Sequence, residues 1–242
     1  MKLPILFLGL IVSTTACTKH QTWSYTGSTG PEHWGELSPA YGMCSSGLEQ
    51  SPINIQAAAQ ADLPALDIHY LSGPATVRHK GHTLEVLPET EGRLILGADS
   101  YDLAQVHFHT PSEEQIEGQR FPLVAHLVHR NQKNELAVIA ILFKEGAENP
   151  ALTPVLSAIP ARKGEVLTLG RLNIADLLPA QRNYYAYMGS LTVPPCTEGV
   201  RWQVLKTPVE LSKAQLQTFQ LLFPANARPV QPTNTRTVQV GG

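Results

Sequence analysis

Apolar and polar residues alternate in short runs along most of the chain. These runs of about four to eight residues are separated by Gly, Pro, Asn and Asp, the residues that favour turns. The pattern is typical of short β-strands, and their regular spacing favours a mainly antiparallel β fold. The predicted strands are residues 67–70, 75–79, 83–86, 92–96, 105–109, 123–130 and 136–144.

Two segments carry signals for short helices instead. Asn149 is a favourable cap and Pro150 suits the first helical position, so a helix is predicted through residues 151–158. Ser212 and Gln215 have the spacing of a capping box and predict a second helix over residues 214–222. The sequence has no internal repeat, low-complexity tract or linker, so we expect a single domain.

The stretch 105–130 carries the strongest chemical signal. Two apolar runs flank a polar turn at residues 117–118, which predicts a β-hairpin with a longer loop. His107 and His109 face the same side of their strand, and antiparallel pairing can place His126 opposite them. Three converging imidazoles are the ligand set of a catalytic zinc, which keeps a fourth position for water. His-x-His also occurs on strands without a metal, so a structural role remains open on these residues alone.

Composition limits the partners that the protein can have. The chain of 242 residues has 18 basic and 20 acidic side chains and no basic run, which argues against a nucleic-acid partner. Its apolar content of 43% is enough for a substantial core. After the N-terminus, no apolar run approaches the ~20 residues that a membrane-spanning helix needs.

Residues 1–17 have the positive start and short apolar core of an export signal. The end of this segment resembles a bacterial lipoprotein cleavage box, in which Cys17 becomes the lipidated first residue. The usual Leu three positions earlier is replaced by Thr14, and ordinary cleavage after Ala16 also fits. We favour the lipoprotein interpretation. It predicts an exported, periplasmic domain over residues 18–242 that touches a membrane only through the lipid.

The cysteine count agrees with export. Cys44 and Cys196 lie inside the domain, and an exported protein tends to pair such thiols. Lipidation would then give a use to the odd residue, Cys17. A bridge between the other two would close a loop of ~150 residues, and two buried free thiols are the alternative.

Six motifs occur in order along almost all of the mature chain. They are Gly-Pro-Glu-His-Trp (30–34), Gln-Ser-Pro-Ile-Asn-Ile (50–55), His-Phe-His-x-Pro-Ser-Glu (107–113), Ala-His-Leu-Val-His (125–129), Leu-Ala-Val-Ile (136–139) and Gly-Ser-Leu-Thr-Val-Pro-Pro-Cys-Thr-Glu (189–198). Together they resemble the α-class carbonic anhydrases of the bacterial exported type. The resemblance implies a large, twisted, mostly antiparallel sheet with a few short surface helices. It also implies reversible hydration of carbon dioxide to bicarbonate and a proton, one Zn²⁺ per chain, and a homodimer such as bacterial members often form.

The resemblance assigns roles to individual residues. His107, His109 and His126 would hold zinc, which would make hydroxide available as the nucleophile at neutral pH. The Thr192 hydroxyl would accept a hydrogen bond from the hydroxide and donate one to Glu113, an acceptor when ionised.

Further matches concern proton transfer and the substrate pocket. His82 matches a proton-shuttle histidine, and Tyr25 matches a tyrosine that orders water in the cavity. Asn234 and Arg236 match residues that support the site from the C-terminal segment. The apolar wall would consist of Val128, Val138, Leu191, Val193, Val200 and Trp202.

The sequence departs from the family at the support of one ligand. Gln105 is placed to accept from His107 as in the family. The family has Glu two residues before the third ligand, where this chain has Val124, and His where this chain has Glu114. We therefore hypothesise that Glu114 supplies the missing carboxylate to His126. Otherwise Glu114 is a solvated turn residue, and a water or a backbone carbonyl serves the histidine.

Two other functions compete with carbon dioxide hydration. Zinc-free relatives act as binding domains, but they usually lose a ligand histidine, and all three are present here. A zinc hydrolase acting on esters is the second rival, which the Thr192–Glu113 pair argues against as the main activity. Weak ester hydrolysis would still accompany a zinc hydroxide in an open site.

Overall fold

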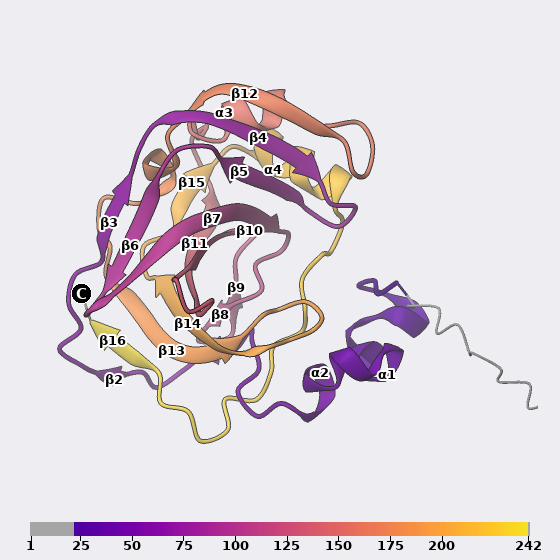
Figure 1. The fold of residues 1–242 in the computed structure, drawn as a ribbon, viewed down its shortest axis with the longest axis vertical. Helices are drawn as coiled ribbons and strands as arrows, with labels where there is room; N and C mark the ends of the chain where they lie inside the picture. The colour runs from indigo at the N-terminus through magenta and orange to yellow at the C-terminus, as the bar shows by residue number, and fades with distance from the viewer. Residues whose placement is uncertain (1–21, 242) are drawn as a thin grey trace, which may run out of the picture.

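The computed structural model describes residues 22–241 (Figure 1). The predicted signal peptide and Cys17 lie outside the described residues. A large twisted sheet forms the framework of the described chain, and a small three-stranded sheet adjoins it. None of the helices in this part of the chain has the length and apolar character that crossing a lipid bilayer requires.

The large sheet has the strand order β12-β4-β5-β7-β10-β11-β14-β13-β16-β2, with β15 beside β11 and β6 joining β3 to β7. Most neighbours are antiparallel, whereas β11–β14, β11–β15 and β16–β2 are parallel. The sheet is therefore mixed, within the predicted fold class. Its strands are β2 (Ala59–Gln60), β3 (Asp67–Tyr70), β4 (Gly73–His79), β5 (Leu84–Pro88), β6 (Gly92–Leu96), β7 (Asp99–His109), β10 (Leu123–Arg130), β11 (Leu136–Glu145), β12 (Val166–Leu172), β13 (Tyr184–Ser190), β14 (Glu198–Leu205), β15 (Val209–Leu211) and β16 (Gln239–Gly241).

The small sheet and the helices surround this framework. The small sheet contains β1 (Asn54–Ile55), β8 (Gln115–Ile116) and β9 (Gln119–Arg120). The α-helices are α1 (Trp34–Leu37), α2 (Met43–Ser46), α3 (Thr153–Ser157) and α4 (Lys213–Leu222), and the 3₁₀ helices are η1 (Gly27–Thr29), η2 (Pro31–His33), η3 (Pro39–Tyr41) and η4 (Ile174–Leu177).

The two predicted helices are present, but one begins later than expected. Helix α4 has the predicted capping box, with reciprocal bonds between Ser212 and Gln215. Asn149 does accept a bond from the Ala151 N–H, yet α3 begins only at Thr153. Pro154 has no N–H to donate to the carbonyl four residues earlier, so the preceding residues form turns instead of a first α-helical turn.

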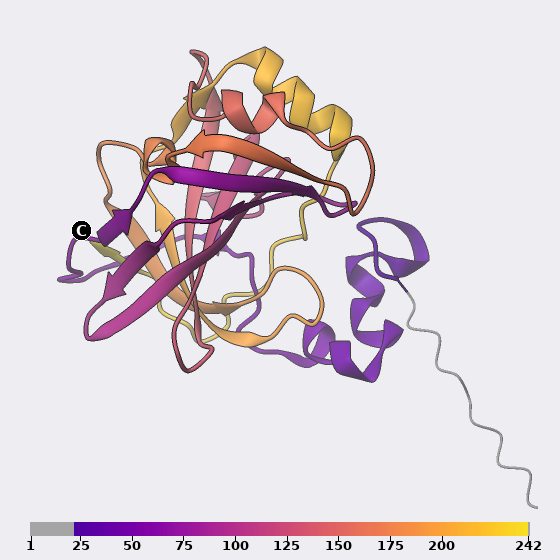
Figure 2. The same ribbon diagram turned by 45° about the horizontal axis from the view of Figure 1, so that its top comes forward.

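Apolar side chains fill both faces of the large sheet. One cluster lies under α3 and α4, which cover one side of the sheet in Figure 2. A second cluster includes Val124, Val128, Val138 and Trp202 and lies on the opposite face of β10, β11 and β14. The alternation of β10 across its two faces explains why nearly all of this strand is buried.

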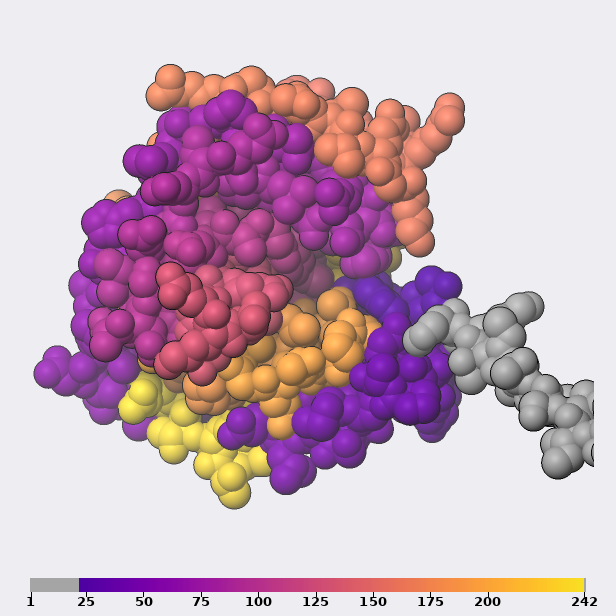
Figure 3. Space-filling model, in the orientation of Figure 1, coloured from indigo at the N-terminus to yellow at the C-terminus, as the bar shows by residue number. Residues whose placement is uncertain are grey.

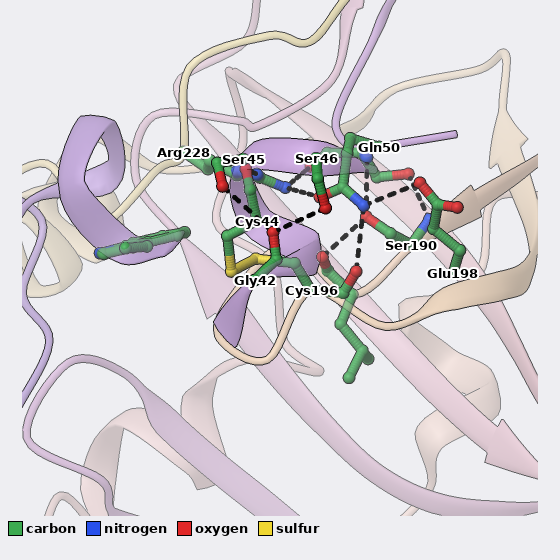
Figure 4. Close-up of a disulfide and its surroundings, with 12 residues drawn as sticks. Gly42, Cys44, Ser45, Ser46, Gln50, Ser190, Cys196, Glu198 and Arg228 are labelled. Atoms are coloured by element: carbon green, nitrogen blue, oxygen red, sulfur yellow. Dashed lines mark hydrogen bonds between the residues drawn. A yellow bond between two sulfur atoms is a disulfide. The ribbon is translucent and has the colours of Figure 1, made fainter. Parts of the chain in front are cut away.

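A disulfide joins the N-terminal segment to the turn after β13. Cys44 on α2 is bonded to Cys196, 152 positions later, as predicted. Gln50 donates to the Cys196 carbonyl, and the Arg228 guanidinium donates to the Cys44 carbonyl (Figure 4). The indigo N-terminal segment thus lies beside the orange β13–β14 region at the molecular surface (Figure 3).

Candidate metal centre

Strands β7 and β10 bring the three predicted ligand histidines together. His126 pairs directly with His107, and His109 lies two residues further along β7 on the same face. The ring centroids are between 4.8 and 5.2 Å apart. One ring nitrogen of each histidine lies within 4.8 Å of those of the other two. The predicted convergence of three histidines from two strands is confirmed.

Neutral acceptors hold two of the rings. His107 Nδ1 donates to Gln105 Oε1 over 2.9 Å. His109 Nδ1 donates to the backbone carbonyl of Asn226 over 2.7 Å. A neutral imidazole carries one N–H, so Nε2 of each of these rings has a free lone pair. It faces the point on which the three histidine rings converge, the shared point of the site.

A carboxylate holds the third ring. His126 Nε2 lies 3.1 Å from Glu114 Oε1 and 3.3 Å from Oε2. This leaves His126 Nδ1 as the lone-pair nitrogen. The alternative in which Glu114 is a solvated turn residue is wrong, because its side chain is completely buried.

Buried acceptors without donors gather at the shared point. His109 Nε2 and Glu113 Oε2 lie 3.4 Å apart, and neither has a hydrogen-bond partner within residues 22–241. Glu113 Oε2 is also 3.9 Å from His126 Nδ1. Facing lone pairs in a buried place are unfavourable unless a cation or proton lies between them. Three imidazole nitrogens are the ligand set of catalytic zinc, so the residues present fit a Zn²⁺ ion.

Burial and neighbouring charges set the protonation of the three histidines. Burial lowers the pKa of His107 and of His109 well below the usual value, and neighbouring histidines lower both further. Burial also lowers the pKa of His126, but the Glu114 carboxylate outweighs this effect, and the net pKa is raised. At neutral pH, His107 and His109 are therefore available as neutral ligands.

Glu113 is fixed beside the histidines by the C-terminal segment. Its Oε1 accepts the Arg228 backbone N–H over 2.8 Å. Burial raises the pKa of Glu113 to about 7, against opposing effects from His126, the Thr192 hydroxyl and the Arg228 N–H. The predicted partner Thr192 is thus close enough to act on this carboxyl group.

A row of cross-strand neighbours lies next to the histidine row. Gln105 pairs with Val128, and Val128 pairs with Val138. Val138 in turn pairs with Trp202, whose ring lies 4.9 Å from that of His126. Three of the residues predicted for the apolar wall are thus cross-strand neighbours on β10, β11 and β14. Of the other predicted wall residues, Leu191 and Val200 join the same apolar cluster, and Val193 lies in the turn between them.

His82 and Tyr25 lie together on the N-terminal side. The Trp23 ring packs against His82 with 4.6 Å between centroids, and Tyr25 follows at 6.4 Å. All three line a surface cavity of about 360 Å³. Burial lowers the pKa of His82 to about 4, and the charges of Lys80 and Lys163 contribute. The Tyr25 hydroxyl is buried and has no hydrogen-bond partner within the described chain.

The C-terminal support predicted from the sequence lies elsewhere. Asn234 donates to the Leu48 carbonyl and Arg236 to the Met188 carbonyl, so neither holds a ligand histidine or Glu113. Asn226 and Arg228 provide that support instead. Both pairs have the spacing Asn-x-Arg, and spacing alone therefore could not distinguish them. Only the position of the segment after α4 in the folded chain distinguishes the two pairs.

Comparisons with known proteins agree on one family. The family profile described as eukaryotic-type carbonic anhydrase matches residues 29–241. A carbonic anhydrase of Pectobacterium carotovorum is 41% identical over 239 residues, covering 98% of each chain. One of Neisseria gonorrhoeae is 40% identical, covering 98% of this chain and 96% of that one. The α-carbonic anhydrase of Thermovibrio ammonificans, solved with the inhibitor sulfanilamide, superposes with a TM-score of 0.88 at 44% identity, covering 90% of this chain and 98% of that one.

Proposed function

Because the chain belongs to the eukaryotic-type carbonic anhydrase family, we propose that it catalyses the reversible hydration of carbon dioxide to bicarbonate and a proton. The supporting observation is the convergence of three imidazoles, each with one nitrogen hydrogen-bonded and the other facing a shared point. His107 and His109 would hold zinc through Nε2, and His126 through Nδ1. Zinc held there would lower the pKa of a bound water to about 7 and would so supply the nucleophile at neutral pH.

Thr192 and Glu113 orient the nucleophile in this proposal. The Arg228 N–H fixes one oxygen of Glu113, and the other makes no hydrogen bond with residues 22–241, although the Thr192 hydroxyl lies near the carboxyl group. That oxygen is available to accept the Thr192 hydroxyl proton. A hydroxyl that donates to a carboxylate can only accept from the nucleophile, so the nucleophile's lone pair is directed toward the substrate.

The apolar row beside the histidines provides the substrate site. Carbon dioxide has no charge and no net dipole, so weak contact with Val128, Val138 and Trp202 is enough to hold it. The side chains of all three are buried in one apolar cluster. Bicarbonate is charged and gains little from such a wall, which favours its release.

His82 carries the proton to solvent in this proposal. Its pKa of about 4 means that the ring is neutral at pH 7 and available as an acceptor. The same value makes the protonated ring unfavourable, so transfer through His82 is expected to limit turnover when buffer is scarce. The cavity beside it gives buffer molecules access.

We also propose that the protein works outside the cytoplasm. The Cys44–Cys196 disulfide supports an oxidising compartment. Labelling of cells with a radioactive fatty acid, comparing the wild-type chain with Cys17→Ser, tests the lipid anchor. Label that persists in the variant would contradict it.

Metal analysis together with stopped-flow hydration of carbon dioxide tests the proposed activity. We expect one zinc per chain and hydration that is lost on chelation and regained on adding zinc. A chain that neither binds zinc nor hydrates carbon dioxide would instead be a binding domain. Zinc-dependent ester hydrolysis without hydration would identify a zinc esterase.

A further inference from the structure

We propose that Glu114 is a positioning residue for the metal site: it orients His126 from the turn that follows β7 and makes this histidine a stronger ligand. The inference rests on the proposed zinc site and deepens it. It implies that metal retention depends on residues of the turn 110–122 that do not touch the metal.

The three acceptors behind the histidines are not equivalent. His107 and His109 are held by an amide oxygen and a backbone carbonyl, both neutral. His126 is held by both oxygens of Glu114. A charged acceptor forms stronger hydrogen bonds and makes the opposite ring nitrogen more basic. The Glu114–His126 pair is therefore expected to contribute most to ligand strength.

The strand itself provides no acceptor for His126. Gln105 serves His107 from two residues earlier on the same face of β7. The corresponding position before His126 is Val124, which is completely buried in the apolar cluster with Ile53 and Ile55. Valine cannot accept a hydrogen bond, so the acceptor has to come from another segment.

The turn after β7 is built to hold Glu114 in place. The Ser112 hydroxyl donates to the Glu114 carbonyl over 2.8 Å and accepts the Phe121 N–H over 3.0 Å. The Gln115 N–H donates to the carbonyl of Ile53, the residue before β1, over 3.2 Å. This bond joins the turn to the segment that contains β1. Ser112 is completely buried, and both bonds of its hydroxyl join it to backbone atoms of the turn and not to a histidine. It nevertheless fixes the backbone from which the carboxylate reaches His126.

The charges of the site favour the same assignment. Glu113 and Glu114 are both completely buried, on either side of the His126 ring. A buried carboxylate is costly unless it is paired. Glu114 has the His126 N–H as its partner, and a divalent cation held by the opposite nitrogen would offset the charge of the pair. The carboxylate therefore favours the loaded site over the empty one.

Zinc retention measured with a chelator tests the assignment. Wild-type protein, Glu114→Gln and the control Glu117→Gln are loaded with zinc, and both the dissociation rate and the equilibrium constant are measured against a chromogenic chelator. Glu117 is an exposed carboxylate in the same turn. We expect Glu114→Gln to weaken zinc binding about 10–100-fold, and the control to match the wild type.

A second pair of variants separates positioning from general stability. Adding Val124→Glu to Glu114→Gln places a carboxylate two residues before His126 and should restore most of the affinity. Ser112→Ala should weaken zinc binding with Glu114 still present. In ¹⁵N NMR of the wild-type protein, the His126 proton should reside on Nε2, and its signal should shift in Glu114→Gln.

Each outcome bears on the proposal. Unchanged zinc affinity in Glu114→Gln, or an equal loss in the Glu117→Gln control, contradicts it. Failure of Glu114→Gln to fold, with no recovery of folding or zinc binding in the double variant, would make Glu114 a purely structural residue. If the wild-type chain itself binds no zinc, the proposed function fails first. The two failures are distinguishable, because zinc binding by the wild-type chain is measured before any variant is compared with it.

Discussion

Removal of the Cys44–Cys196 disulfide should destabilise the protein strongly. The perturbation is the double substitution Cys44→Ser and Cys196→Ser, which leaves no unpaired thiol at either position. The bridge spans 152 positions, more than two thirds of the described chain. A cross-link of this length restricts the unfolded state more than a short one does.

The chain-entropy relation gives the magnitude. A loop of this length corresponds to at most about 5 kcal/mol of stabilisation at 25 °C. For a domain of this size, each kcal/mol shifts Tm by about 2–4 °C, so a decrease on the order of 10–20 °C is the upper expectation. Gln50 still donates to the Cys196 carbonyl, and Ser51 and Ser190 still bond to each other, so the turn should retain its place below the transition.

Thermal unfolding with and without dithiothreitol is the assay. Reductant should lower the Tm of the wild-type protein to that of the double variant and should leave the variant unchanged. Hydration activity at 25 °C should fall much less than stability, because hydrogen bonds retain the segment that carries Thr192. A Tm shift under about 2 °C in both reductant and variant would refute the reasoning, since the bridge would then constrain little.

Four further outcomes follow from the site and its surroundings. Burial lowers the pKa of His129 to about 4, so the unfolded chain binds an extra proton between about pH 6.5 and pH 4. The free energy of unfolding should fall by up to about 3 kcal/mol as the pH decreases through that range. His129→Gln should flatten the dependence of Tm on pH, and an unchanged dependence in the variant would contradict the role of His129. Lys163→Gln removes a positive charge near His82 and should raise the pKa of that ring above about 4 in an NMR titration, whereas no change or a decrease contradicts the assigned cause. Thr192→Ala should lower kcat about 10²-fold with zinc content unchanged, and full activity would exclude the hydroxyl from the reaction. Val128→Phe should fill the apolar wall and lower kcat/KM more than about tenfold with zinc retained; wild-type kinetics would place the substrate elsewhere.

The sequence predicts those parts of the fold that depend on local pattern. Strands β3, β6 and β10 have the predicted bounds, because alternation and turn residues define both of their ends. The hairpin turn at Glu117–Gly118 is also as predicted, and both residues have positive φ values, 51° and 80°. The meeting of His107 and His126 then follows from pairing alone.

The strands after residue 145 were not predicted, and the reason is physical. In β13, polar, aromatic and small residues follow one another without a clean alternation, and β15 and β16 have only three residues each. Their pairing is set by neighbours distant in the chain, such as β11 with β14, which are parallel. Local pattern contains little information about such contacts.

The acceptors that hold the histidine rings also differ in whether local sequence reveals them. Gln105 could be assigned because it lies two residues from its partner on one strand. Asn226 lies 117 residues from His109 and contributes a backbone carbonyl, which no residue type reveals. Glu114 could be proposed only because Val124 leaves an acceptor missing.

The separation of His109 from Asn226 along the chain also determines when the binding site can form during synthesis. The three histidines lie within a stretch of 20 residues, yet the acceptor that fixes the His109 ring is synthesised 117 residues after it. A nascent chain that has emerged only as far as β10 has all three imidazoles but no fixed ring orientation for His109. The complete binding site exists only after the segment following α4 has docked. We therefore expect tight metal binding only after this segment has been synthesised and has docked.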